Sequence, residues 1–410
     1  MFRIIRVPPV LDTFFHTLQP HFHWDHFAYF RLLVVVIAFA WGRRNVASLY
    51  RYLDAQHHRT RFNNFFLVAR WDPEAALRQK AQEVVMALHP RQGETLYLVI
   101  DDSKTPKRGT HMDAVAKMKD PVTEAYIQGH QYVCAILRFR HQIIPYGIRL
   151  YVKPEHCPAL DLPFRKTTEL AAQLVREFEA PAGVKVMVLF DTYYLCRGVV
   201  QACRERHFHF ASTLKSNRTL FKAGWKLKAG RYGRNLFRRR RTATLVLARP
   251  HGQAHYRFVD AGWLEVSTLG PLHVVFSRKG TAQHILGLVT DDSELSATEL
   301  MQTYEKRWAV EQFFKDCKQL LGLGQYQNRT YHAAVTHLHL VCFAYALLTH
   351  LRIMRPGAQG QRKHDKAADW STAAAQEQLR GLIWDDIIAD LKEKTHGEPV
   401  FTVLERLRVA

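Results

Sequence analysis

Two short apolar runs, each followed by aspartate, restrict the fold of this chain more than any other feature. Residues 96–100 are followed by Asp101 and Asp102, and residues 184–190 by Asp191. Apolar runs of this length predict strands buried on both faces, as in a sheet covered by helices. Ligands of such α/β sheets bind at the carboxyl ends of the strands. We therefore expect an α/β fold in which Asp101 or Asp102 meets Asp191 at one edge of the sheet.

Basic residues outnumber acidic residues along the whole chain. The sequence holds 58 Lys and Arg against 37 Asp and Glu, a formal net charge of +21. A surplus of this size favours nucleic acid as the partner, because Lys and Arg displace counterions from phosphates. A membrane surface is the alternative. No strongly basic amphipathic helix stands out, however, and the longest apolar run, within residues 32–41, is shorter than the roughly 20 residues that a spanning helix needs.

The cysteines indicate the compartment. The six cysteines are scattered and form no CxxC pair, which indicates neither a zinc site nor a disulfide framework. Unpaired, buried thiols fit a reducing environment, so we expect a cytoplasmic protein without a membrane partner.

The period of the apolar residues changes along the chain and predicts its organisation. Helical periodicity before residue 90, interrupted by short basic breaks such as residues 57–61, predicts a small helical domain that contacts DNA. A plain helical cap on the next domain is the alternative. Further strands are expected at 131–139, 143–152 and 208–214, and helices at 167–178 and 194–204. The expected segments are 1–90 (helical, N-terminal), 91–214 (first part of the core), 215–291 (β-rich insertion), 292–355 (second part of the core) and 356–410 (C-terminal helical region, loose over 356–375).

A run of arginines lies within the β-rich segment, between residues 231 and 241. It is interpreted either as a solvated face or as a loop between strands that contacts phosphate. The candidates for phosphate contact are the four consecutive arginines Arg238, Arg239, Arg240 and Arg241.

Residues 295–321 predict one long helix with a mixed polar stripe. At about 100° per residue, Tyr304, Arg307, Glu311 and Lys318 fall on one side of it, beside an apolar stripe that would face the core. One carboxylate would thus lie at the core boundary among an Arg, a Lys and a Tyr hydroxyl. An ordinary surface helix, with Glu311 paired to Lys315, is the alternative.

These spacings resemble a known family. Tyr304, Arg307, Glu311 and Lys318 match the Tyr-Arg-Glu-Lys (YREK) signature of insertion-sequence-four type DDE transposases. The segment LYLVIDDS resembles the family's first-Asp motif, and VLFDTYY, followed by LKSNR at residues 214–218, its second-Asp region. The β-rich insertion is also a feature of that family. The resemblance covers roughly residues 90–350, and the helical start resembles the family's DNA-binding region more weakly.

The resemblance implies an RNase H-like core and a metal-dependent nuclease and strand transferase. Asp101, Asp191 and Glu311 would hold two Mg²⁺ ions, which Mn²⁺ can replace. Asp102 is the alternative to Asp101. Neighbouring residues of a strand point to opposite faces, so only one of the two can ligate, and the Asp-x-Ser spacing favours Asp101. The enzyme would cleave transposon ends and join them to target DNA.

The resemblance also implies DNA contacts and partners. Arg307 and Lys318 would grip phosphate and Tyr304 would donate a hydrogen bond to it, while Lys215 and Arg218 would position the strand. Trp308 would stack on a displaced base or else pack in the core. The partners would be double-stranded DNA, both terminal inverted repeats and target, and a second copy of the chain on that DNA, in the nucleoid of a bacterial cytoplasm. The alternatives are an RNase H-like nuclease that cuts without joining and an inactive, transposase-derived DNA-binding protein.

Overall fold

The computed structural model describes residues 4, 7–53, 58–109, 111–119, 124–249, 252–354 and 371–394. The chain folds into two compact units. The helical unit comprises residues 1–88, 109–113 and 314–410, and the sheet unit comprises residues 89–108 and 114–313. Most of the segment expected to be loose, residues 356–375, lies outside the described residues, as do residues 395–410.

The helical unit is built around one central helix, α11 (Tyr331–Met354), which packs against α2, α4, α5 and α12. By length and composition α11 passes as a membrane-spanning helix, but 89% of its most apolar window is buried inside the protein, as in the core helix of a soluble domain. The other helices of this unit are η1 (Pro9–Leu11), α1 (Asp12–Phe15), η2 (His16–His21), α2 (Trp24–Phe39), α3 (Val46–Tyr50), α4 (Arg59–Val68), α5 (Pro73–Met86) and α12 (Thr372–Lys394).

The interpretation of residues 57–61 as a break was wrong at its C-terminal end, because α4 begins at Arg59. The side chain of His58 accepts a hydrogen bond from the backbone N–H of Thr60 and caps the helix. Phe62, Phe65 and Phe66 are all buried on one side of α4. Their spacing of three and four residues is the helical signal that the basic start of this segment obscured.

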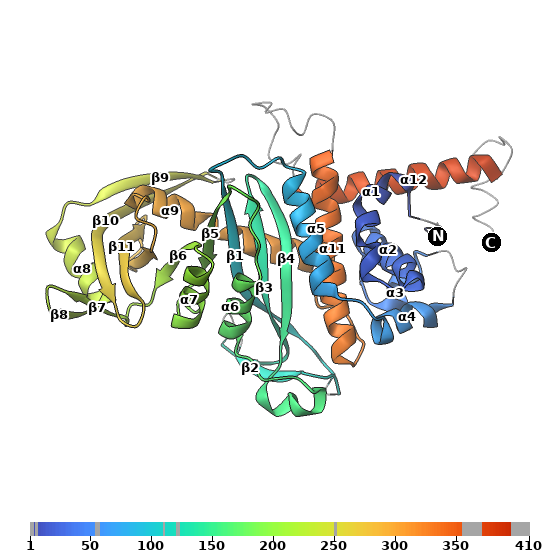
Figure 1. Cartoon of the computed structure of the whole chain (residues 1–410), viewed down its shortest axis with the longest axis horizontal. Coiled ribbons are helices and arrows are strands. Elements are labelled where there is room, and N and C mark those ends of the chain that lie inside the picture. The colour runs from blue at the N-terminus through green and yellow to red at the C-terminus, as the bar shows by residue number, and fades with distance from the viewer. Residues whose placement is uncertain are drawn as a thin grey trace. The chain divides into compact units, whose positions relative to one another are not determined.

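The sheet unit contains a mixed sheet in the order β2-β3-β1-β5-β6-β12-β11-β10-β7-β8, with β4 beside β3 and β9 beside β10 (Figure 1). Strands β1, β5 and β6 are parallel neighbours, and the other pairings are antiparallel. The expected α/β class is therefore confirmed. The strands are β1 (Thr95–Pro106), β2 (Ala116–Lys119), β3 (Tyr126–Phe139), β4 (Gln142–Tyr151), β5 (Lys185–Phe190), β6 (His209–Leu214), β7 (Thr219–Lys222), β8 (Trp225–Lys228), β9 (Ala243–Arg249), β10 (Gly252–Val266), β11 (Gly270–Lys279) and β12 (Leu286–Thr290).

Helices α6 (Thr167–Arg176) and α7 (Arg197–Glu205) pack against each other and cover one face of the parallel strands (Figure 1). Helix α6 approaches β4 so closely that a Cβ built on Gly147 would lie 2.6 Å from the Leu174 side chain. Helix α9 (Ala297–Glu305) packs against β6 and β12, and short 3-10 turns, η3 (Pro154–His156) and η4 (Pro158–Leu160), lead from β4 towards α6.

Strand β1 does not end at the aspartates, as the sequence had suggested, but continues to Pro106. Its parallel pairing with β5 stops at Val99, opposite Leu189, whereas its antiparallel pairing with β3 continues as far as Pro106. Asp101 and Asp102 therefore lie inside a strand but just beyond the end of its parallel neighbour. The long β3 provides the backbone hydrogen-bonding partners that extend β1. The sequence of residues 101–106 itself gives no sign of this pairing.

The arginine run lies mostly in helix α8 (Ala229–Arg239), so the interpretation as a loop was wrong, whereas the alternative of a solvated face agrees with the exposed arginines. Ala229, Gly233 and Leu236 are buried at spacings of four and three residues, which places the arginines on the outer side. The long strand β10 of the β-rich segment contains a bulge between Asp260 and Gly262.

Candidate active site

Asp101 and Asp191 face each other across the parallel strands. The strand register pairs Val99 with Leu189, so continuing both strands by two residues sets Asp101 opposite Asp191 on the same face. The backbone N–H groups of Tyr193 and Tyr194 donate to Asp191 Oδ1 over 2.9 and 3.3 Å, which fixes this carboxylate at the end of β5.

Asp102 points to the opposite face, towards α6. Ile100 lies on the same face of β1 as Asp102. It pairs with Ala135 of β3, which in turn pairs with Gly147 of β4, and Gly147 lies directly beneath α6. Its carboxylate accepts hydrogen bonds from Tyr194 Oη at 3.0 Å and from Gln131 Nε2 at 2.7 Å. Sequence reasoning missed both partners, because they come from a distant strand and a loop and belong to no motif.

The segment expected as one long helix, 295–321, is two helices: α9 ends at Glu305 and α10 (Trp308–Leu320) begins after a short turn. The backbone N–H groups of Lys306, Arg307, Ala309 and Val310 donate to carbonyls three residues earlier, which tightens the chain at the junction. No Gly or Pro lies between residues 297 and 320 to signal the break. Instead, both side chains of the turn contact β1: Lys306 Nζ donates to Tyr97 Oη at 2.6 Å, and Arg307 bonds to Asp101.

Arg307 joins two of the three acids. Its Nη1 donates to Asp101 Oδ2 at 3.0 Å and its Nη2 to Glu311 Oε1 at 2.6 Å. The Arg307 side chain is only 14% exposed, Asp101 20% and Glu311 36%, so the pairing is largely shielded from water. Asp101 and Arg307, 206 positions apart in the sequence, are thus in direct contact. The guanidinium group of Arg307 bridges Asp101 and Glu311.

Burial and crowding of like charges raise the pKa values of both aspartates. Desolvation raises the pKa of Asp101 to about 7; Arg307 opposes the shift, and Asp191 adds to it. Desolvation also raises the pKa of Asp191 above its usual range, against hydrogen bonds from the backbone of Tyr193 and Tyr194. Burial alone would lower the pKa of Arg307, but Tyr304, Asp101 and Glu311 together raise it, so this cation stays charged. The site is short of positive charge for the carboxylates it holds.

The other candidates of this segment are Tyr304, Trp308 and Lys318. Tyr304 lies beside Arg307, whose guanidinium carbon is 5.7 Å from the ring centroid, and its hydroxyl is 3.4 Å from Thr213 Oγ1. Trp308 is 50% exposed, so it is not a core tryptophan. Lys318 lies two turns beyond Glu311 along α10, in the part of that helix that belongs to the helical unit.

The remaining candidates lie on the insertion and its approach. Lys215 is exposed after β6, and Arg218 Nη2 donates to the carbonyl of Leu195 at 2.7 Å, which ties the start of the insertion to the loop after Asp191. Arg238, Arg239, Arg240 and Arg241 are half or fully exposed at the end of α8 and just beyond it. Arg240 donates to the Asp260 carbonyl at 3.2 Å. In the part of the chain that the structure describes, none of the four contacts the three acids.

The acids fit a divalent cation by their chemistry. Carboxylate oxygens are the ligands that Mg²⁺ and Mn²⁺ prefer, and the raised pKa values of Asp101 and Asp191 indicate a place where added positive charge is favourable. Among the described residues, no three His, Cys, Asp or Glu side chains already surround a single point. Arg307 lies between Asp101 and Glu311, and its guanidinium is the cation that these two carboxylates share.

The raised pKa of Asp101 predicts how stability depends on pH in metal-free protein. Because the folded pKa, about 7, exceeds the unfolded value near 3.8, this group contributes stability below about pH 4 and loses it as the pH rises through 7. Asp101→Asn should therefore be more stable than the wild type at pH 8 by on the order of 2–4 kcal/mol, and nearly equal to it at pH 4. Urea unfolding with a chelator at both pH values measures the difference. Parallel curves for the two proteins would contradict the assignment of the shift to Asp101.

One comparison with known proteins found a match. Residues 165–347 match the family model of a transposase DDE domain, which supports a DDE transposase family and an enzyme that acts on DNA. Members of such a family typically use a divalent metal. The matched stretch includes Asp191, Tyr304, Arg307 and Glu311 and begins after Asp101. No curated protein matches the chain.

Proposed function

We propose that this chain is an insertion-sequence-four type DDE transposase that cleaves the ends of a DNA element and joins them to target DNA. The observation that carries the proposal is the contact of Arg307 with both Asp101 and Glu311, on the face of the sheet where Asp191 ends the neighbouring strand. The three acids come from separate segments and follow the chain order Asp, Asp, Glu of the DDE motif. The YREK spacing and the match to the transposase DDE domain support the same assignment.

Asp101, Asp191 and Glu311 would hold two Mg²⁺ or Mn²⁺ ions. When bound, such ions activate the attacking water or 3′-hydroxyl and stabilise the oxygen that leaves phosphorus. The protein must supply ionised carboxylates, so Asp101 has to lose the proton that its raised pKa retains in metal-free protein. Arg307 must also release at least one of its two carboxylates.

Arg307 would transfer its donors to the DNA phosphate beside the cut, where a planar guanidinium makes strong, directional hydrogen bonds. Burial raises the pKa of Tyr304, so its hydroxyl stays protonated and donates to the same phosphate. Lys318, Lys215 and Arg218 would contact the neighbouring backbone. Trp308, half-exposed at the start of α10, would stack on a displaced base.

The proposed domain roles follow the same reasoning. The parallel strands β1, β5 and β6 with α6 and α7 would form the RNase H-like core, and β7 to β12 with α8 the insertion. Residues 1–90 would bind the element ends, and the arginines at the end of α8 would contact backbone phosphates. Because two ends must be joined, two copies of the chain would assemble on the DNA.

The test uses purified protein and duplex DNA that carries the terminal inverted repeats of the element. With Mg²⁺ or Mn²⁺ we expect nicking at the repeat ends and joined products with a target plasmid, and neither product in a chelator. Cleavage without joined products would instead support the RNase H-like nuclease. Binding of DNA without cleavage in either metal would support the inactive DNA-binding relative.

A further inference from the structure

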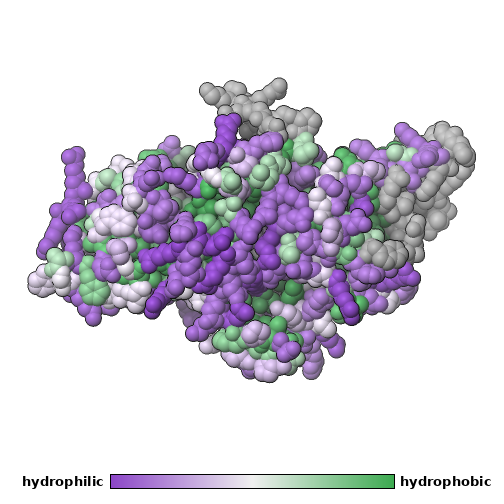
Figure 2. Space-filling view, viewed as in Figure 1, coloured by the Kyte–Doolittle hydropathy of each residue, from purple (hydrophilic) through white to green (hydrophobic). Residues whose placement is uncertain are grey.

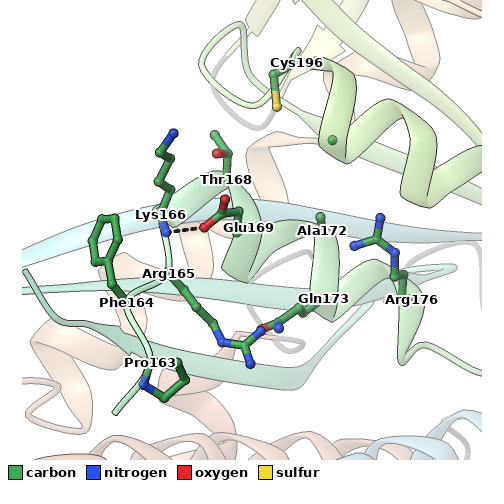
Figure 3. Close-up of a pocket in the computed structure, with 11 residues that line it drawn as sticks. Pro163, Phe164, Arg165, Lys166, Thr168, Glu169, Ala172, Gln173, Arg176 and Cys196 are labelled. Carbon is green, nitrogen blue, oxygen red and sulfur yellow. Dashed lines mark hydrogen bonds between the residues drawn. The ribbon is translucent and has the colours of Figure 1, made fainter. Parts of the chain in front are cut away.

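A pocket of about 520 Å³ lies on the α6 and α7 side of the sheet unit (Figure 3). Its wall comes from the segment that enters α6, from α6 itself and from the start of α7, including Cys196 and Gly198. Figure 2 shows hydrophilic side chains gathered over these two helices. None of the candidate residues expected from the sequence lines this pocket, so the proposed chemistry does not account for it.

Most of the charged side chains that line the pocket are positive. Arg165, Lys166 and Arg176 contribute cations, and Glu169 contributes a single carboxylate. Glu169 accepts a hydrogen bond from the backbone N–H of Lys166 at 2.8 Å, and Arg176 is paired with Glu205 outside the pocket at 2.7 Å. Arg165 and Lys166 are exposed, and within the described chain no carboxylate lies within ion-pair distance of either side chain. Two cations therefore remain for an external anion.

The pocket is linked to the carboxylate site through Tyr193, in the loop after Asp191. Tyr193, two residues after Asp191, donates its backbone N–H to Asp191 Oδ1 at 2.9 Å. Its hydroxyl is 2.7 Å from Thr167 Oγ1, at the first residue of α6 between the lining residues Lys166 and Thr168. The short loop that begins at Asp191 thus leads to Cys196 and to Gly198 in the first turn of α7, both of which line the pocket.

We propose that this pocket binds backbone phosphates of the DNA that the carboxylate site cuts. The inference rests on the proposed function and adds a second phosphate contact to it. The partner is nucleic acid because exposed aromatic rings accompany the cations: Phe164, in the pocket wall, is 41% exposed, and Tyr193 is 49% exposed. Cations that track the backbone beside rings on which bases stack are the combination that single-stranded segments of DNA require.

Gly198 offers a sharp test, because a side chain can be added there without disturbing the fold. A Cβ at this position meets no atom within 4 Å, and the backbone is not in the left-handed region. Gly198→Glu places a negative charge in the first turn of α7, where it stabilises the helix. The neutral Gly198→Gln has nearly the same size and serves as the matched control. A double variant, Arg165→Ala with Lys166→Ala, removes the cations and keeps the backbone N–H that Glu169 accepts.

The measurement is the affinity of the full chain for a repeat-end duplex with a single-stranded flank, without metal, over a series of KCl concentrations. Compared with Gly198→Gln, Gly198→Glu should bind about tenfold more weakly at low salt, because it repels the phosphates. The double variant should lower the slope of log affinity against log salt by about 1–2, which corresponds to one or two lost phosphate contacts. Inorganic phosphate at the same ionic strength should not displace the DNA.

Equal affinities of the two Gly198 variants and an unchanged salt slope in the double variant would overturn the inference, whether or not the wild type cleaves DNA. Displacement of DNA by millimolar inorganic phosphate would also overturn it, since the pocket would then be a site for free anions. If the variants behave as expected but the wild type fails to cleave in Mg²⁺ or Mn²⁺, the proposed function fails while the phosphate-binding pocket stands.

Discussion

Replacing Glu311 with glutamine is expected to abolish metal-dependent DNA cleavage and to leave DNA binding almost unchanged. The glutamine keeps the size of the side chain and an oxygen that can accept from Arg307, but it removes the charge that a divalent cation requires. Loss of an ion that supplies several kcal/mol of transition-state stabilisation corresponds to a decrease in rate of about 10³-fold or more. Binding depends mainly on the basic surface, which this substitution does not alter.

Glu305→Gln is the matched control for Glu311→Gln. Glu305 is the last residue of α9, only six positions earlier, and the substitution removes one carboxylate of the same type from outside the trio. Cleavage of a repeat-end duplex and its binding by electrophoretic mobility shift are measured for both variants. The control should keep wild-type cleavage. Full cleavage by Glu311→Gln, or equal losses in the two variants, would remove Glu311 from the proposed metal site.

The two neighbouring aspartates of β1 should respond very differently to the same substitution. Asp101→Asn is expected to lose cleavage as completely as Glu311→Gln, because Asp101 faces Asp191 and contacts Arg307. Asp102→Asn is expected to retain cleavage within about tenfold and to lose only about 1 kcal/mol of stability, because its carboxylate faces α6 and is held by Tyr194 and Gln131. One experiment therefore tests both the assignment of faces and the choice of ligand.

Cleavage rates at saturating Mg²⁺ and thermal melting of both asparagine variants measure this contrast. Rescue by Mn²⁺ provides a further check. Mn²⁺ shares the preference of Mg²⁺ for oxygen ligands but accepts nitrogen more readily, so it should still bind a site that the substitution has weakened. Retained cleavage in Asp101→Asn together with its loss in Asp102→Asn would reverse the assignment of the metal ligand. Equal loss in both variants would show that the face on which an aspartate lies does not decide its role in cleavage.

Several elements were predictable because their signal is local. The strand at 184–190 is an apolar run and the helix at 167–178 has an amphipathic period, both visible in the sequence, and the structure has β5 and α6 there. The arginine run was misinterpreted because charge obscured the period: only Ala229, Gly233 and Leu236 mark the buried side of α8, and two of these are small residues that contribute little to an apolar pattern.

The candidate site divides in the same way. The acidic residues and their spacing to Arg307 were visible in the sequence, since a motif is a property of the chain itself. The break between α9 and α10 was not, because it coincides with contacts of Lys306 and Arg307 to Tyr97 and Asp101 on a strand some two hundred positions earlier. The pocket beside Asp191 was equally hidden, since its cations become neighbours of that loop only through the bond between Thr167 and Tyr193.

The order of chemical groups along this chain, its α/β class and the approximate place of its main helices and strands are properties of the sequence alone, because burial periodicity and residue type act over a few positions. Only the tertiary structure showed which aspartate of β1 contacts Arg307, how Arg307 holds two carboxylates at once, and that two cations lie in a pocket near the loop after Asp191. Each of these depends on which face of the sheet a distant helix covers, and that choice is made by packing across the fold, where spacing along the chain carries no information.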